Sequence, residues 1–251
     1  MARVIIALSG GVDSAVAASL LQDAGHRVEA LFMSNWEEDE DGYCTSAADF
    51  QDARRVAGEL GIPLHKASFA REYRERVFAH FLSELEAGRT PNPDVLCNRE
   101  IKFGVGLAYA NRLGAERFAT GHYARIGSRG ELLRGVDDEK DQSYFLHSLD
   151  SVRLAGCEFP VGGLRKPEVR SIARERGIPV ADKRDSTGIC FIGERPFGHF
   201  IGTWLPARPG PIETIDGSVI GRHRGLERYT LGQRSGLGVG GLRGRGDDPW
   251  F

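Results

Sequence analysis

An early stretch of the chain, ALSGGVDS, combines backbone freedom with hydrogen-bonding side chains: Ser9, Gly10, Gly11, Asp13 and Ser14. A glycine-rich turn between a parallel strand and a helix binds phosphate, because the N–H groups at the helix N-terminus point at the anion. The hydroxyls add donors, and a carboxylate beside phosphate indicates a magnesium ion between them. The glycines alone would fit a plain strand–turn–helix joint, which does not explain the polar residues. The string therefore predicts a phosphate loop that is neither GxxxxGK[ST] nor GxGxxG.

Four cysteines, Cys44, Cys97, Cys157 and Cys190, are scattered along the chain without a CxxC pair. This spacing is not that of a zinc module or a secreted disulfide framework. Cys97 follows the loop-like string GRTPNPDVL, and Cys190 lies in RDSTGICFIGER. Because thiolates are nucleophiles, these two positions are candidates for covalent chemistry. We expect Cys44 and Cys157 to be structural thiols.

The chain of 251 residues has a formal net charge of -2, with 41% hydrophobic and 27% charged residues. These values are typical of a globular protein that buries a core. They give no overall positive field for nucleic acid, so only a local patch could bind it. No apolar run is long enough to span a bilayer, and the start lacks a secretory signal. We therefore expect a cytoplasmic protein with no membrane partner. The acidic run WEEDEDG is interpreted as a solvated loop and not as a metal site.

Apolar runs alternate with helical patterns over the first half of the chain. Strands are expected near residues 3–8, 27–33, 64–69 and 117–122, and helices near 13–24, 46–60, 70–87 and 101–113. This alternation predicts an α/β fold with a doubly wound parallel sheet in residues 1–150.

The pattern changes after residue 150. Helices expected near 166–176 and 196–203 predict a small, mainly helical domain over residues 151–206, which carries Cys190. Residues 207–251 turn β-like, with a hairpin signal at Asp216-Gly217. Since this last segment holds too few strands for a core of its own, we expect a partial, truncated β-domain there.

The string SGGVDS resembles the pyrophosphatase loop of ATP pyrophosphatases, and further strings specify the family more closely. These are GRTPNPDVLCNREIKFG, RDSTGICFIGER, ATGHYAR, DEKDQSYFL, FMSNWEEDE with YCT, and YTLGQRSGLGVGG. In order and spacing they resemble the tRNA-specific 2-thiouridylase family, which consists of ATP-dependent tRNA sulfurtransferases. The resemblance runs along almost the whole chain. It implies an adenine nucleotide alpha hydrolase-like sheet domain, and a C-terminal β-barrel that begins in this chain.

The resemblance implies a role for each matching residue. The residues implied to bind ATP are Ala7, Leu8, Ser9, Gly10, Gly11, Val12, Asp13, Ser14, Met33 and Gly121. The implied catalytic residues are Cys97 and Cys190, with Asp94 as an acid–base partner. Asn92, Pro93 and Asp94 are implied to contact the target base, and Lys140, Asp141, Gln142 and His122 to contact tRNA.

The implied reaction is 2-thiolation of the wobble uridine in the tRNAs for Lys, Glu and Gln. ATP with Mg2+ adenylates the C2 oxygen, which makes it a good leaving group and releases pyrophosphate. Sulfur arrives as a persulfide on Cys190, and attack by Cys97 leaves a Cys97–Cys190 disulfide. Whether the persulfide attacks carbon directly or releases hydrosulfide first stays open. Depressed cysteine pKa values are expected, aided by Arg99, Lys102 or Lys183.

The expected sulfur donor is a cysteine desulfurase or a sulfur-relay carrier protein, and no iron–sulfur cluster is expected. Tyr144, Phe145 and Phe191 are expected in the core and not as base-stacking groups. His122 could be a catalytic residue or a strand-end residue satisfied by the backbone. Some of the arginines near the C-terminus are expected to contact tRNA phosphate. These arginines are Arg222, Arg224, Arg228, Arg234, Arg243 and Arg245.

Two other functions are compatible with part of the pattern. Another pyrophosphatase-loop ligase could amidate a small molecule, and it would need an ammonia source but no cysteine pair. Alternatively, the chain could bind nucleotide or tRNA without catalysis.

Overall fold

The computed structural model describes residues 1–36, 46–185, 196–233 and 236–239. The chain divides into two compact units. The first unit comprises Met1–Val77 and Pro93–Gly193, and the second comprises Phe78–Asn92 and Glu194–Phe251. The predicted boundaries after residues 150 and 206 stay predictions.

A parallel sheet forms the centre of the first unit. Within the described residues its order is β3-β2-β1-β4-β7, and every neighbouring pair is parallel. The strands are β1 (Arg3–Ala7), β2 (Arg27–Ser34), β3 (Leu64–Ser68), β4 (Arg117–Ala119) and β7 (Cys157–Glu158). This confirms the predicted parallel α/β sheet. Strand β7 escaped prediction because two residues, one of them charged, give no apolar run.

Helices cover both faces of this sheet, so its central strands are buried on both sides. On β4, Ala119 belongs to the core beneath α1 (Val12–Asp23), whereas the ring of its neighbour Phe118 contacts Phe103 at 5.9 Å. Successive strand residues point to opposite faces, so the two contacts mark two covered faces. This explains why β1 reads as a nearly continuous apolar run.

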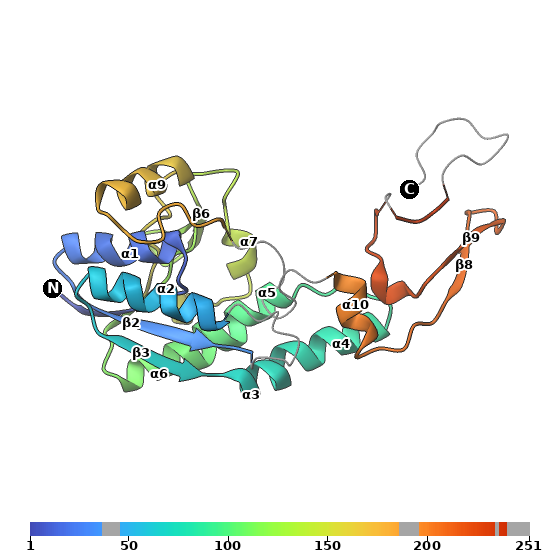
Figure 1. Cartoon of the computed structure of the whole chain (residues 1–251), viewed down its shortest axis with the longest axis horizontal. Helices are drawn as coiled ribbons and strands as arrows, with labels where there is room; N and C mark the ends of the chain where they lie inside the picture. Colours follow the sequence, from blue (N-terminus) through green and yellow to red (C-terminus); the bar gives the residue numbers. More distant parts are fainter. Residues whose placement is uncertain (37–45, 186–195, 234–235, 240–251) are drawn as a thin grey trace. The chain divides into compact units, whose positions relative to one another are not determined.

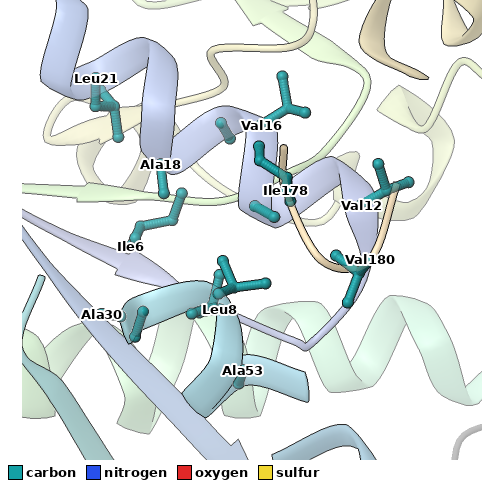
Figure 2. Close-up of a cluster of buried hydrophobic side chains, with 14 of the residues drawn as sticks. Ile6, Leu8, Val12, Val16, Ala18, Leu21, Ala30, Ala53, Ile178 and Val180 are labelled. Carbon is teal, nitrogen blue, oxygen red and sulfur yellow. The ribbon is translucent and has the colours of Figure 1, made fainter. Parts of the chain in front are cut away.

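One face is covered by α1 and α2 (Ser46–Glu59), and α9 (Lys166–Glu175) packs on α1. Figure 1 shows α1 and α2 on the same side of the strands. Side chains of α1 meet Ile6 and Leu8 of the first strand region, and Ile178 and Val180 pack on α1 from the chain that follows α9 (Figure 2). Strand β7 and helix α9 belong to the first unit.

Two helical stretches contain π-helical segments. The first is α3 (Ala70–Tyr73), η1 (Arg74–Phe78) and α4 (Ala79–Glu86). The second is α5 (Pro93–Leu96), η2 (Cys97–Gly106) and α6 (Leu107–Arg112). The second begins at Pro93 and not near residue 101 as predicted, because proline fits the first position of a helix. Cys97 consequently lies inside a helical stretch.

Smaller elements complete the first unit. They are β5 (Ala124–Ile126), which pairs antiparallel with β6 (Leu132–Arg134), and the short helices α7 (Ser143–Leu146) and α8 (Ser151–Leu154). No described helix has the length and apolar character needed to cross a membrane.

The second unit contains α4, α10 (Phe197–Gly202), β8 (Gly210–Glu213), β9 (Val219–His223) and the 3-10 turn η3 (Leu226–Arg228). Strands β8 and β9 pair antiparallel, and Gly217 between them has φ +84°. This confirms the Asp216-Gly217 hairpin. Rings of Phe78, Phe200 and Trp204 contact one another, and the first two are buried.

Replacing Ile6 tests the sheet core. Ile6 is fully buried, so Ile6→Ala removes packed methylenes and leaves a cavity, which lowers the free energy of unfolding by about 2–5 kcal/mol. Ile215 is fully exposed, and Ile215→Ala is expected to change it by less than about 0.5 kcal/mol. Urea unfolding followed by circular dichroism measures both, and equal effects would contradict the assigned core.

Candidate active site

The loop between β1 and α1 is held by its own polar groups. Ser14 Oγ accepts from Ser9 N at 3.2 Å and donates to the Gly11 carbonyl at 3.1 Å, while Gly11 N donates to Ser9 Oγ at 3.3 Å. Helix α1 starts at Val12, and no described side chain caps its N-terminus at Gly11. The first N–H groups of α1 are therefore suited to an anionic ligand.

Gly10 cannot be replaced without strain. Its φ is +78°, and a Cβ atom there would overlap the Asp49 carbonyl oxygen of α2. The phosphate loop thus lies directly against the start of a second helix, and glycine is required for this approach.

The turn after β4 approaches the same loop. A Cβ atom at Gly121 would lie 2.6 Å from Ser14 N and 2.8 Å from the Asp13 carbonyl carbon. Strands β2 and β4 flank β1 and run parallel to it, so the carboxyl ends of all three strands lie at the same edge of the sheet. In open parallel sheets such an edge, where the strand order reverses, holds the ligand.

The predicted adenosine residue Met33 lies near the end of β2. Its sulfur would be 2.7 Å from a Cβ atom at Gly106, so it packs closely on η2. Ala7 and Leu8 are buried, with 9% and 1% of their surface exposed. Their side chains belong to the core, which leaves their backbone for contact with a nucleotide. The predicted ATP-binding roles of these residues stay predictions.

An ion-pair network covers Asp13 in the phosphate loop. Lys166 Nζ lies 2.7 Å from Asp13 Oδ1 and 2.7 Å from Asp185 Oδ1. Asp185 also pairs with Arg170 and Lys140, each at 2.9 Å. Partial burial acts to raise the pKa of Asp185, but hydrogen bonds and charges from Lys166 and Lys140 outweigh it and lower the pKa to about 2.

Lys183, two residues before Asp185, contacts the loop at Gly10 and the helix α2 beside it. Its Nζ donates to the Gly10 carbonyl at 3.1 Å and pairs with Asp49 at 2.7 Å and Asp52 at 2.6 Å. The sequence suggested Lys183 only as a group that lowers the pKa of a cysteine thiol, which stays a prediction, and these ionic partners carried no local signal. Sequence reasoning missed Lys166 and Asp185, because pairing across some 150 residues leaves no local pattern.

Tyr123 completes the surroundings of Asp13. Its hydroxyl donates to Asp13 Oδ1 at 2.8 Å. Burial and then the charge of Asp13 raise the pKa of Tyr123 above its ordinary value of 10.0, so the phenol stays protonated and acts as a donor.

Cys97 and Asp94 lie one turn apart on one helical stretch. Cys97 is the first residue of η2 and is 4% exposed, and Asp94 lies in α5, after the buried Pro93. Burial raises the pKa of the Asp94 carboxyl, and the nearby Lys102 opposes the shift. A carboxyl group with a raised pKa exchanges protons closer to neutral pH, as an acid–base group requires. Asn92 directly precedes this helix.

Cys190 and Phe191 lie outside the described residues, as does Cys44. The predicted Cys97–Cys190 pair and the depressed pKa values of the two thiols therefore stay predictions. Cys157 is buried, as expected of a structural thiol, and its sulfur donates to the Arg153 carbonyl at 3.0 Å. Burial raises the pKa of the Cys157 thiol to about 12.

The residues predicted to contact tRNA make internal contacts. Lys140 pairs with Asp185, and Asp141 accepts from Gly135 N and Ser143 Oγ, each at 2.8 Å. The side chain of Gln142 accepts from Tyr123 N at 3.0 Å. These contacts fix the loop before α7, and the tRNA roles of the three residues stay predictions.

His122 is a buried ring, 8% exposed, that hydrogen-bonds Thr120 Oγ1 through Nδ1 at 2.7 Å. Burial, and then the charge of Lys102, hold the pKa of His122 well below 6.5, so the ring is neutral at pH 7. Its predicted tRNA role also stays a prediction.

Tyr144 corrects one expectation. The side chain was expected in the core, but the residue is 59% exposed on the four-residue helix α7, whose buried residue is Leu146. The helix is too short to bury more than one face.

Some of the C-terminal arginines gather in the second unit. Arg222, Arg224 and Arg228 line a pocket of about 510 Å³ together with Tyr229 and Gln233. Arg234, Arg243 and Arg245 lie outside the described residues.

Comparison with known proteins connects both units to one family. A family model described as the HUP domain of a tRNA methyl transferase matches residues 2–194, and its PRC-barrel domain matches residues 198–251. The barrel match agrees with the predicted start of a β-barrel.

Several curated relatives are named as tRNA-thiolating enzymes. The tRNA-specific 2-thiouridylase MnmA of Marinobacter nauticus is 59% identical over 257 residues, which cover 99% of this chain and 65% of that protein. The proteins of the same name from Pseudomonas paraeruginosa and Sodalis glossinidius are 59% and 58% identical, and the matches cover 99% of this chain and 68% and 69% of those proteins. The chain thus spans about two thirds of the length of these relatives.

Gly121→Ala tests the approach of the β4 turn to the phosphate loop. The added Cβ overlaps the Asp13–Ser14 backbone, so the loop must shift, and ATP affinity is expected to fall about tenfold or more. Gly163→Ala is the matched control, because no described atom lies within 4 Å of its Cβ. Calorimetric titration with ATP measures both, and unchanged affinity in Gly121→Ala would separate this turn from the nucleotide site.

The neutral His122 ring predicts a pH dependence of stability. Since its pKa is lower in the folded than in the unfolded chain, the unfolded chain binds the extra proton below pH 6.5. Folding is therefore destabilised by up to about 1.5 kcal/mol between pH 6.5 and pH 5. Urea unfolding at both pH values is expected to show a smaller loss for His122→Gln than for the wild type. The exposed His80 provides the control, and a loss abolished by His80→Gln instead would refute the assignment.

Proposed function

The chain belongs to the tRNA-specific 2-thiouridylase family, and on this premise we propose that it 2-thiolates the wobble uridine of tRNA in an ATP-dependent reaction. The observation that carries the proposal is identity of 58–59% to relatives of that name along 99% of the chain. The phosphate loop and the Asp94–Cys97 turn supply the groups for adenylation and for thiol chemistry. We propose the tRNAs for Lys, Glu and Gln as substrates, and a cytoplasmic location.

Adenylation is the step that the phosphate loop supports. The loop and the first turn of α1 bind the polyphosphate of ATP with Mg2+ as its counter-ion, while the uridine C2 oxygen attacks the α-phosphorus. Pyrophosphate leaves, and C2 now carries AMP as a leaving group. Positioning of the reacting groups and electrostatic stabilisation by the loop and the helix N-terminus contribute to this step.

Sulfur transfer then uses the cysteine pair. The terminal sulfur of a Cys190 persulfide forms the new bond to C2, and AMP leaves with its bonding electrons. The Cys97 thiolate attacks Cys190 Sγ, which breaks the S–S bond and leaves 2-thiouridine and a Cys97–Cys190 disulfide. Asp94 acts as the acid–base partner that accepts and returns the protons of the reacting thiols. A thiol reductant restores the pair, and a cysteine desulfurase or a relay carrier reloads Cys190.

The tRNA must present its base away from the stack. An anticodon loop is single-stranded, so a wobble base is turned outward at low energetic cost. The residues proposed to contact the target base precede Cys97 by three to five positions: Asn92, Pro93 and Asp94. This spacing suits a base held near the Cys97 thiol. The arginine-lined pocket of the second unit is suited to RNA phosphate.

Incubation with unmodified tRNA-Glu, ATP, Mg2+, a thiol reductant and a cysteine desulfurase with its cysteine substrate tests the reaction, with mass spectrometry of the digested tRNA as the readout. We expect 2-thiouridine that depends on ATP, together with AMP and pyrophosphate in equal amounts. Pyrophosphate release that requires an amine acceptor and no tRNA would replace the proposal with a small-molecule ligase. ATP binding without turnover would replace it with a non-catalytic binding role.

Replacement of single thiols tests the mechanism. Cys97→Ser and Cys190→Ser are each expected to lower thiolation by about 1000-fold or more, because a hydroxyl replaces the nucleophile or the sulfur carrier. Cys157→Ser is the control. Its thiol is buried with a pKa of about 12, and activity is expected to stay within a few-fold of the wild type. Full activity in Cys97→Ser would eliminate the proposed resolving step.

A further inference from the structure

Asp13 presents an electrostatic problem for the phosphate loop. It lies in the first turn of α1, where the helix dipole and the N–H groups otherwise favour an anion. An uncompensated carboxylate at this position would repel the polyphosphate of ATP. A cation close to Asp13 is therefore needed if the loop is to bind ATP tightly.

Lys166 is placed to supply that charge. Its Nζ lies 2.7 Å and 2.9 Å from the two Asp13 carboxylate oxygens, and its side chain is 10% exposed. The Asp13 side chain is 31% exposed, so water screens the attraction between the two groups only in part. The ammonium also lies 5.8 Å from the centre of the Tyr123 ring, so an aromatic face borders it.

We propose that Lys166 is the counter-ion of the phosphate loop: it offsets the charge of Asp13 so that the loop accepts the polyphosphate of ATP. Asp185 is the positioning residue that holds the Lys166 ammonium against Asp13. This inference rests on the proposed function, in which the loop binds ATP.

The packing of α9 does not require a charge at position 166. Val169, Ala173 and Ile178 belong to the buried cluster shared with α1, and they join α9 to the sheet unit by apolar contacts. The Lys166 backbone N also donates to Asp137 at 2.8 Å, a bond that any non-proline residue would keep. The ammonium group therefore contributes to the field at Asp13 more than to the attachment of the helix.

Asp185 is itself embedded among cations. Oδ1 accepts from Arg170 and Lys166, and Oδ2 accepts from Lys140. Arg170 additionally donates to the carbonyls of Ala181 and Lys183, at 2.7 Å and 3.0 Å, so the backbone that carries Asp185 is fixed. With its pKa lowered to about 2, Asp185 stays ionised at neutral pH and keeps Lys166 in place.

The test compares the dissociation constants of ATP and AMP, measured by calorimetric titration in EDTA so that no divalent cation acts on Asp13. In Lys166→Met, ATP affinity is expected to fall about 10- to 100-fold, the range for loss of a charged partner, whereas AMP affinity falls less than about threefold. Lys166→Arg keeps the charge and is expected to keep most of the ATP affinity.

A double variant isolates the role of Asp13. If Lys166 acts by offsetting Asp13, then Asp13→Asn combined with Lys166→Met removes both charges and restores ATP affinity to within about threefold of the wild type. The matched control is Arg174→Met, which removes a cation from the exposed face of α9, where Arg174 pairs with Asp182. Its ATP affinity is expected to be unchanged.

Equal losses for ATP and AMP in Lys166→Met, or no recovery in the double variant, would overturn the proposal. If Lys166→Met does not fold, Asp185→Asn takes its place, and a loss of affinity for ATP without a loss for AMP is expected there too. A wild-type chain that does not bind ATP would contradict the proposed function itself, which is a different outcome from ATP binding that is indifferent to Lys166.

Discussion

The close approach of two backbones at the carboxyl edge of the sheet is the constraint on which the rest of the site depends. The turn after β4 comes so near the first turn of α1 that only glycine fits at position 121. On the opposite side, Gly10 fits against the Asp49 carbonyl for the same reason. The phosphate loop is thus enclosed by backbone on both sides, and its geometry is set by the packing of strands and helices and not by flexible side chains.

Charge is organised around that enclosure. Lys183 and Asp185 lie two residues apart. Lys183 donates to the Gly10 carbonyl, and Asp185 holds Lys166, which pairs with Asp13. A buried ion pair gains stability only when its partners are well placed, since desolvation of each charge is costly. The network meets this requirement because Lys166 and Lys183 each pair with two carboxylates, and Asp185 pairs with three cations.

Local patterns in the sequence were enough to predict the strand–turn–helix joint from β1 to α1 and most of the parallel sheet. The β1 run is apolar because both faces of the sheet are covered, and the Asp216-Gly217 turn needs only its own glycine. The missed features are those without a local signal. Strand β7 is two residues long, Tyr144 lies on a helix too short to be buried, and Lys166 meets Asp13 only after the chain has folded across the sheet.

The buried Cys157 has a consequence for thiol selectivity. Disulfide exchange proceeds through the thiolate, and burial raises the pKa of the Cys157 thiol to about 12, so this thiol stays protonated at pH 7. The first unit therefore holds the Cys157 thiol beside strand β4 in an unreactive, protonated form. Burial thus suppresses the reactivity of this thiol towards disulfides while its side chain fills the core.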